Sequence, residues 1–186
     1  MRCRRLLTIL AVATLSLCVL STQAQRPHTN AVSFPEHSRS VSPNGRYVLV
    51  GVDAGKEPSH TVYLEDSQLK SQRKLFNYDR HIDLLWNPDS ESFAVSDYAG
   101  SDYSRCSIVS VTESVSPVQV WDELIKAAPV NEQKSFLRND HVYIAATEWI
   151  SSKVLKVKVW GHGEVNPAGF TRFYRYEIGL GITRQQ

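Results

Sequence analysis

A short stretch of this sequence recurs 45 positions further along, and this repeat limits the folds open to the chain. Residues 42–50 (SPNGRYVLV) align with residues 87–95 (NPDSESFAV), so that a Pro, a polar turn and an apolar run coincide. The same offset places Ala54-Gly55 over Ala99-Gly100. A sequence that repeats at this period predicts a fold built from stacked copies of one supersecondary unit.

A third, weaker copy follows the second at an offset of about 50, with Arg138-Asn139-Asp140 as its turn and residues 142–146 as its strand. It lacks the Pro. In the first two turns Pro fixes φ, and the Asn, Asp, Gly or Ser residues let the chain reverse before it enters a strand. We therefore expect about three units.

Segments rich in β-branched and aromatic residues lie between polar turns, which predicts a mainly β fold. The expected strands are residues 39–41, 47–52, 61–64, 74–76, 82–86, 93–96, 107–111, 142–146, 153–160 and 170–178. The apolar run after each turn is continuous, which is typical of a strand covered on both faces. A four-stranded unit of about 45 residues with neighbours on both sides has the pattern of a propeller blade.

One short helix is expected to interrupt the strands, over residues 116–128. Ser116 is a favourable N-cap, Pro117 suits the first helical position, and Gln119 completes a capping box. The apolar residues of this segment form one stripe: Val118, Trp121, Leu124 or Ile125, and Ala128. Pro129 should end the helix.

Residues 1–24 have the three parts of a secretory signal. Arg2, Arg4 and Arg5 precede an apolar run over 6–20, and Thr22-Gln23-Ala24 offers the small residues that a signal peptidase selects. The run has 15 residues, whereas a spanning helix needs about 20. We therefore predict cleavage after Ala24, export to the periplasm or the medium, and no transmembrane segment in the mature chain.

Loss of the signal changes the formal charge from +2 to −1, because Lys+Arg falls from 21 to 18 against 19 Asp+Glu. A near-neutral chain without a Lys/Arg block offers no electrostatic footprint for nucleic acid. Cys106 becomes the single Cys, so no internal disulfide can form in an oxidising compartment. We expect a buried, reduced thiol.

The repeated turns resemble the WD-like β-propeller repeat of the TolB type. The resemblance is carried by Ser42-Pro43-Asn44-Gly45-Arg46 with its strand, and by residues 86–90 with Phe93 to Asp97 and then Gly100. In that repeat a Ser-Pro-Asp-Gly-like turn leads to a strand and then to a loop with Asp and Gly. Two units match well and the third poorly. The resemblance implies a binding or scaffold module.

The chain is short for a closed propeller, which typically has at least four blades. The 162 residues after Ala24 make about 3.6 units of 45 residues. We therefore expect a mainly β, propeller-related fold of about three antiparallel blades that is not a full ring. It would occupy residues 41–186, after an N-terminal segment at 25–40. The alternative is a β-sandwich.

No catalytic motif stands out, since Gly-x-Ser-x-Gly, His-Glu-x-x-His and Gly-rich phosphate loops are all missing from the sequence. We therefore expect a non-enzymatic secreted or periplasmic module without metal or cofactor. Its partner would be another protein or an envelope component, and self-association stays open. The alternative is a small extracytoplasmic hydrolase that uses Asp53, Asp97 and Asp102, with or without Ca²⁺.

If the units are equivalent, the loops after their second strands emerge at one end of the assembly. These loops are residues 53–57, 97–104 and 147–151. Aromatic residues on exposed loops are favoured anchors for partners. The predicted binding residues are therefore Asp53, Asp97, Tyr98, Asp102, Tyr103 and Trp149. For Trp149 the alternative is that its ring caps the sheet core, because Trp is highly buried on average.

Overall fold

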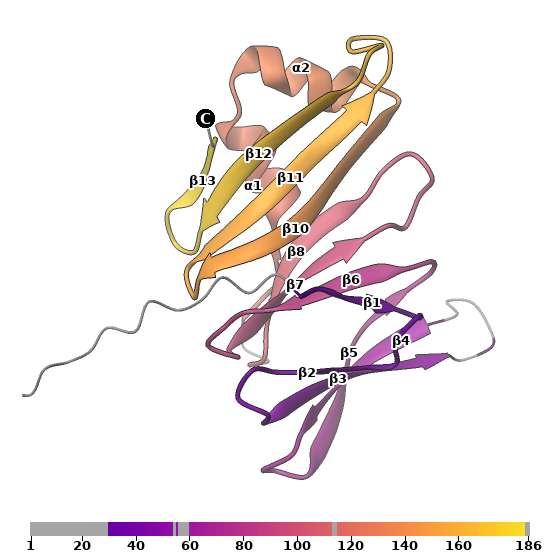
Figure 1. Cartoon of the computed structure of the whole chain (residues 1–186), viewed down its shortest axis with the longest axis vertical. Helices are drawn as coiled ribbons and strands as arrows, with labels where there is room; N and C mark the ends of the chain where they lie inside the picture. The colour runs from indigo at the N-terminus through magenta and orange to yellow at the C-terminus, as the bar shows by residue number, and fades with distance from the viewer. Residues whose placement is uncertain (1–29, 54, 56–59, 113–114, 185–186) are drawn as a thin grey trace, which may run out of the picture.

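The computed structural model describes residues 30–53, 55, 60–112 and 115–184. Over these residues the chain forms three antiparallel sheets and two helices, and the sheets do not close into a ring (Figure 1). The expected mainly β, propeller-like fold of about three units is thus confirmed, and the chain does not adopt the alternative two-sheet sandwich. The predicted signal at 1–24 lies outside the described residues.

The first sheet is the first repeat. Its strands in spatial order are β2 (Arg39–Val41), β3 (Tyr47–Asp53), β4 (His60–Asp66) and β5 (Ser71–Tyr78). The predicted turn joins β2 to β3, with the Asn44 side chain accepting hydrogen bonds from Ser42 Oγ and Arg46 N at 2.8 and 2.9 Å. Gly45 has a φ of +73°, a conformation that glycine adopts without strain.

The middle sheet contains the second repeat. Its order is β1 (Val32–Phe34), β6 (Ile82–Trp86), β7 (Ser92–Asp97), β8 (Arg105–Ser110) and β9 (Val118–Gln119). Strand β7 has both faces buried, as its apolar run predicts: Ala94 packs on one side, and Phe93 and Val95 on the other. Strand β1 was not predicted, and its pairing with β6 adds an N-terminal strand to this sheet.

The third sheet is formed by β10 (His141–Ser151), β11 (Val154–His162), β12 (Phe170–Glu177) and β13 (Gly181–Arg184). The predicted third turn at 138–140 is wrong, because those residues connect a helix to β10. The hairpin turn equivalent to the first two is Ser152-Lys153. The predicted loop at 147–151 is also wrong, since β10 continues through two β-bulges and pairs with β11 as far as Ser151.

Two helices replace the single predicted one. They are α1 (Val120–Ala127) and α2 (Val130–Arg138). Val118 and Gln119 pair with β8 and form strand β9. The capping-box pattern had placed these two residues in the first turn of the helix. Pro129 ends α1 as predicted, and its carbonyl then accepts the first hydrogen bonds of α2 from the amides of Glu132 and Gln133.

Two apolar clusters hold the sheets together, and the middle sheet contributes to both. One cluster joins the first and middle sheets and contains Phe34, Leu49, Val62, Leu84, Phe93 and Val95. The other joins the middle and third sheets to the helices and contains Leu85, Ala94, Cys106, Leu124, Trp149, Leu155 and Val157. Cys106 is fully buried, as predicted.

Candidate ligand-binding site

The second strands of the three sheets, β3, β7 and β11, end on the same side of the molecule (Figure 1). We call this side the loop end; its described parts are the facing strand ends at Asp53 and His60, loop 98–104 and loop 163–169. The opposite side, the turn end, carries the turns at 42–45, 87–90 and 152–153. This arrangement is the one expected of equivalent blades.

Hydrogen bonds join neighbouring turns at the turn end. Asn44 N donates to Ser90 Oγ at 3.1 Å, and Asn87 Nδ2 donates to Ser152 O at 2.8 Å. Asn87 is completely buried. These hydrogen bonds fix the position of each sheet relative to its neighbour. Because the turns are used in this way, we look for a ligand site at the loop end.

Five of the six predicted site residues lie at the loop end, and Trp149 does not. Trp149 lies within β10, is fully buried and donates its indole N–H to Leu85 O at 3.1 Å. A large apolar ring gains more from filling the space between two sheets than from exposure on a loop. The prediction that Trp149 lies on an exposed loop is wrong.

A cavity of about 270 Å³ lies between loop 98–104, the two helices and the start of β10. Acidic, basic and aromatic side chains meet in its lining: Asp102, Tyr103, Ser104, Arg105, Trp121, Phe136, Asn139, Asp140 and Val142. Two predicted residues, Asp102 and Tyr103, are among them. A concave site that combines aromatic surface with a few polar groups is typical of ligand recognition.

Backbone and side-chain hydrogen bonds hold the cavity's loop against β10. Val142 N donates to Asp102 O at 2.9 Å, and Tyr143 Oη donates to Ser101 O at 2.6 Å. The buried Ser104 hydroxyl donates to Ile144 O at 2.8 Å and accepts from Ile144 N at 2.7 Å. The cavity wall is therefore fixed by the third sheet.

The ring of Tyr103 folds back over its own loop. A Cβ at Gly100 would come within 2.5 Å of that ring, so glycine at this position gives the ring its space. The guanidinium of Arg105 lies 5.4 Å from the ring centroid, a distance at which the cation is attracted to the ring face. Tyr103 is still 38% exposed and available to a partner.

Tyr98 is the first residue of the cavity's loop but does not line the cavity. Its ring stacks on His81, with centroids 4.3 Å apart and planes 12° apart. Burial raises the pKa of the Tyr98 hydroxyl, and the nearby Asp83 carboxylate raises it further. Tyr98 is therefore a neutral phenol at physiological pH and a structural neighbour of the cavity.

Asp97 ends β7 and is half-buried. Burial raises the pKa of its carboxyl group, Asp79 adds to this, and Arg105 and His81 oppose it. Its Oδ1 atom is buried without a hydrogen-bond partner among the described residues. The charges that act on Asp97 do not include the other two predicted carboxylates.

Asp53 belongs to the first sheet, where its carboxylate accepts a hydrogen bond from Gly55 N at 3.0 Å. Of the three carboxylates in the hydrolase alternative, therefore, Asp102 alone lines the cavity. Across the described ranges, no group of three or more His, Cys, Asp or Glu side chains is arranged to hold a metal ion.

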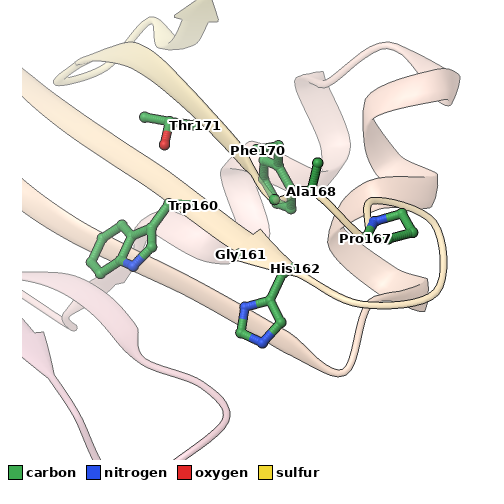
Figure 2. Close-up of a pocket in the computed structure, with 8 residues that line it drawn as sticks. Trp160, Gly161, His162, Pro167, Ala168, Phe170 and Thr171 are labelled. Atoms are coloured by element: carbon green, nitrogen blue, oxygen red, sulfur yellow. The ribbon is translucent and has the colours of Figure 1, made fainter.

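A second hollow lies at the loop end of the third sheet, with a volume of about 510 Å³. The side chains that line it are drawn in Figure 2. Trp160 and His162 project from one face of β11, and residues 167–171 form the other wall. Gly161 lies between them, where a Cβ would stand 2.1 Å from His141 O. This hollow was not predicted from the sequence, where its signal is the Gly-His-Gly pattern at 161–163.

The helical side of the first cavity was not predicted from the sequence either. Trp121 and Phe136 supply aromatic surface there from α1 and α2. The sequence places Trp121 in an apolar stripe, and that pattern cannot show that part of the ring borders a cavity. The second helix, which carries Phe136, was not predicted.

The described helices are all too short to span a lipid bilayer. Comparison of the sequence with known protein families and with curated proteins finds no match.

Among solved structures, the chain is similar to the β-propeller domain of the Trilobed protease from Pyrococcus furiosus, which is described as having an open velcro topology. The two are 18% identical with a TM-score of 0.54. The match covers 84% of this chain and 43% of that one, so this chain spans less than half of the structure that it resembles. The class defined by the fold is therefore a partial, propeller-like β structure.

Proposed function

We propose that this protein is an exported, non-enzymatic binding module built from propeller repeats of the TolB type. Its partner is another protein or an envelope component, which binds at the loop end. The observation that carries the proposal is the cavity in which Asp102 and Tyr103 meet aromatic rings from both helices.

The lining of the cavity favours a basic side chain of the partner. Asp102 and Asp140 supply two carboxylates against the single guanidinium of Arg105. The faces of Tyr103 and Trp121 attract cations. A Lys or Arg side chain would meet both kinds of group at once, and aromatic pockets of this kind often carry most of the energy of a protein interface.

The proposal is tested by capture from an envelope extract on immobilised protein, followed by mass-spectrometric identification and titration of the purified partner. Asp102→Asn and Trp121→Ala should each weaken binding at least about tenfold, the loss expected from one hot-spot contact. Asp122→Asn is the matched control, because Asp122 is an exposed acid on α1 outside the cavity.

Binding that is equally strong in the two cavity variants would contradict the proposed site. A captured molecule that is chemically changed by the protein would favour the hydrolase alternative. Equal melting temperatures for all variants show that a loss of binding is not a loss of folding.

Export is the other part of the proposal. The proposed organisation is a signal at 1–24, an N-terminal segment at 25–40 and a β domain at 41–186. It is supported by the order of basic, apolar and small residues at the start of the sequence. The intact mass of the native protein should correspond to a chain that begins at Gln25, and a mass that includes Met1 would contradict export through this signal.

A further inference from the structure

The two end sheets of the array each have one face that no other sheet covers in the described part of the chain. On the first sheet, this outer face includes Val41, Val48, Val50, Val52 and Tyr63. Arg39 and Glu65 lie on the same face and form a salt bridge with 2.7 Å between Nη2 and Oε2. Val41 is 58% exposed and Val52 is 44% exposed. A row of β-branched side chains on one sheet face is typical of a surface that packs against another sheet.

The repeat shows which kind of neighbour this face would take. The offset of 45 places Val48 and Val50 over Phe93 and Val95 of the middle sheet. Phe93 and Val95 pack against the first sheet, which precedes the middle sheet in the array. The outer face of the first sheet is therefore the face that packs on a preceding blade.

The outer face of the third sheet has the opposite role. It carries Tyr143, Lys156, Lys158, Trp160 and Phe173. These side chains point away from Leu155, Val157 and Val159 of β11, which pack into the cluster that the third sheet shares with the helices and the middle sheet. This outer face is thus the one that packs on a following blade.

Aromatic rings and charged side chains share the outer face of the third sheet, where Lys156 Nζ also lies 3.6 Å from Glu148 Oε2. The rings of Tyr143 and Trp160 stack with centroids 5.4 Å apart. The ammonium groups of Lys158 and Lys156 lie 4.8 and 5.4 Å from the rings of Trp160 and Phe173. A neighbour that packs on this face would therefore contact the rings together with the alkyl chains of the two lysines.

The molecule therefore carries both halves of one blade-to-blade contact. We propose that two copies of this chain close a ring, with the first sheet of each copy packed on the third sheet of the other. When the two copies are related by a two-fold axis, both outer faces of each copy are covered by the other copy. The similar propeller domain supports this stoichiometry, because one copy accounts for 43% of that chain.

The area of the faces suits a stable dimer. A sheet of four strands with seven residues in its central strands is roughly 24 Å long and 19 Å wide, or about 450 Å². Ring closure buries four such faces, roughly 1,800 Å² in total, which lies within the range of specific protein interfaces. This inference is independent of the ligand proposed for the loop end.

The oligomeric state of the purified protein, measured by light scattering across a concentration series, tests the inference. The native protein should have twice the mass of one chain. Val50→Glu and Trp160→Lys each place a charge in both interfaces of the dimer, and each should raise the dissociation constant roughly thirtyfold or more. Val130→Glu, at a helix residue that is 69% exposed and outside both faces, should leave the dimer intact.

Mixing the two variants separates ring closure from other dimers. In a mixed pair, one interface is native and the other sets a carboxylate against an ammonium group, so the dimer should return. If Val50→Glu alone dissociates the dimer, the first sheets pair with each other; if Trp160→Lys alone does so, the third sheets pair. Either result overturns the proposal.

A monomeric native protein, or an assembly larger than a dimer, also overturns it. If Val50→Glu does not fold, as judged by circular dichroism, Val41→Glu replaces it, because Val41 lies on the same face and is 58% exposed. A dimer that persists in the folded Val41→Glu variant counts against the proposal.

Discussion

Asp66 stabilises the hairpin of β3 and β4, because its carboxylate accepts hydrogen bonds from the Arg46 guanidinium and from two backbone amides. Arg46 Nη2 donates to its Oδ2 atom at 2.7 Å, and the amides of Gln68 and Leu69 donate to Oδ1 at 2.9 and 3.2 Å. The hydrogen bond from Arg46 lowers the pKa of the Asp66 carboxyl group most, desolvation opposes it, and the hydrogen bonds from the two amides lower the pKa further. The charged form of Asp66 is therefore part of the folded state.

We expect Asp66→Asn to lower the melting temperature at neutral pH. A depressed pKa in the folded state adds stability above the ordinary value of 3.8, and this stability is lost as the pH falls through the folded pKa. The difference from the native protein should therefore shrink below that value. A difference that is constant from neutral to acid pH would contradict this account, and Glu164→Gln in an exposed loop serves as the control.

Cys106 is the second residue whose environment sets its chemistry. It is completely buried, and burial raises the pKa of its thiol to about 12. Because the thiolate is the reactive form, we expect the folded protein to resist a thiol reagent at pH 8 and the urea-unfolded protein to react at once. Rapid labelling without denaturant would show that the thiol is accessible.

At the scale of the elements, the hairpin of β10 and β11 depends on one close approach. A Cβ at Gly161 would meet the carbonyl oxygen of His141 at 2.1 Å, and backbone cannot move away as a side chain can. Gly161→Ala should therefore lower the free energy of unfolding by about 1–3 kcal/mol, the usual cost of overpacking.

Urea unfolding measures this effect. Thr171→Ala is the control, because Thr171 is an exposed strand residue paired with Trp160 next to Gly161, and it should change the free energy by less than about 0.5 kcal/mol. Equal effects of the two substitutions would mean that the strands can separate at no cost.

At the scale of the whole molecule, the middle sheet couples the other two. Alternate residues of β7 enter different apolar clusters, so neither cluster can lose its packing without exposing the middle sheet. We therefore expect one cooperative unfolding transition for the described part of the chain.

Trp149→Ala tests this coupling. It removes a fully buried ring and the hydrogen bond to Leu85 O, and it should lower the free energy of unfolding by about 3–5 kcal/mol. Far- and near-ultraviolet circular dichroism should give one common midpoint, whereas separate midpoints would show that the third sheet unfolds alone.

The sequence by itself determined the features that depend on local chemistry. The turns at 42–45 and 87–90 follow from Pro, Asn, Asp and Gly, whose backbone preferences act within a few residues. The two-sided burial of β7 follows from its continuous apolar run. Asp102 and Tyr103 were predicted to lie in a loop from the local sequence as well, and they lie in the loop between β7 and β8.

Tertiary structure decided the rest, because those choices depend on partners far away in the sequence. Strand β1 forms because β6 offers it an edge, and residues 118–119 are strand because β8 pairs with them in place of a helical turn. Trp149 is buried because β10 lies against the middle sheet. The cavity at the loop end exists because two helices and a loop from different parts of the chain lie side by side there. The sequence pattern of any one of these segments cannot predict that contact.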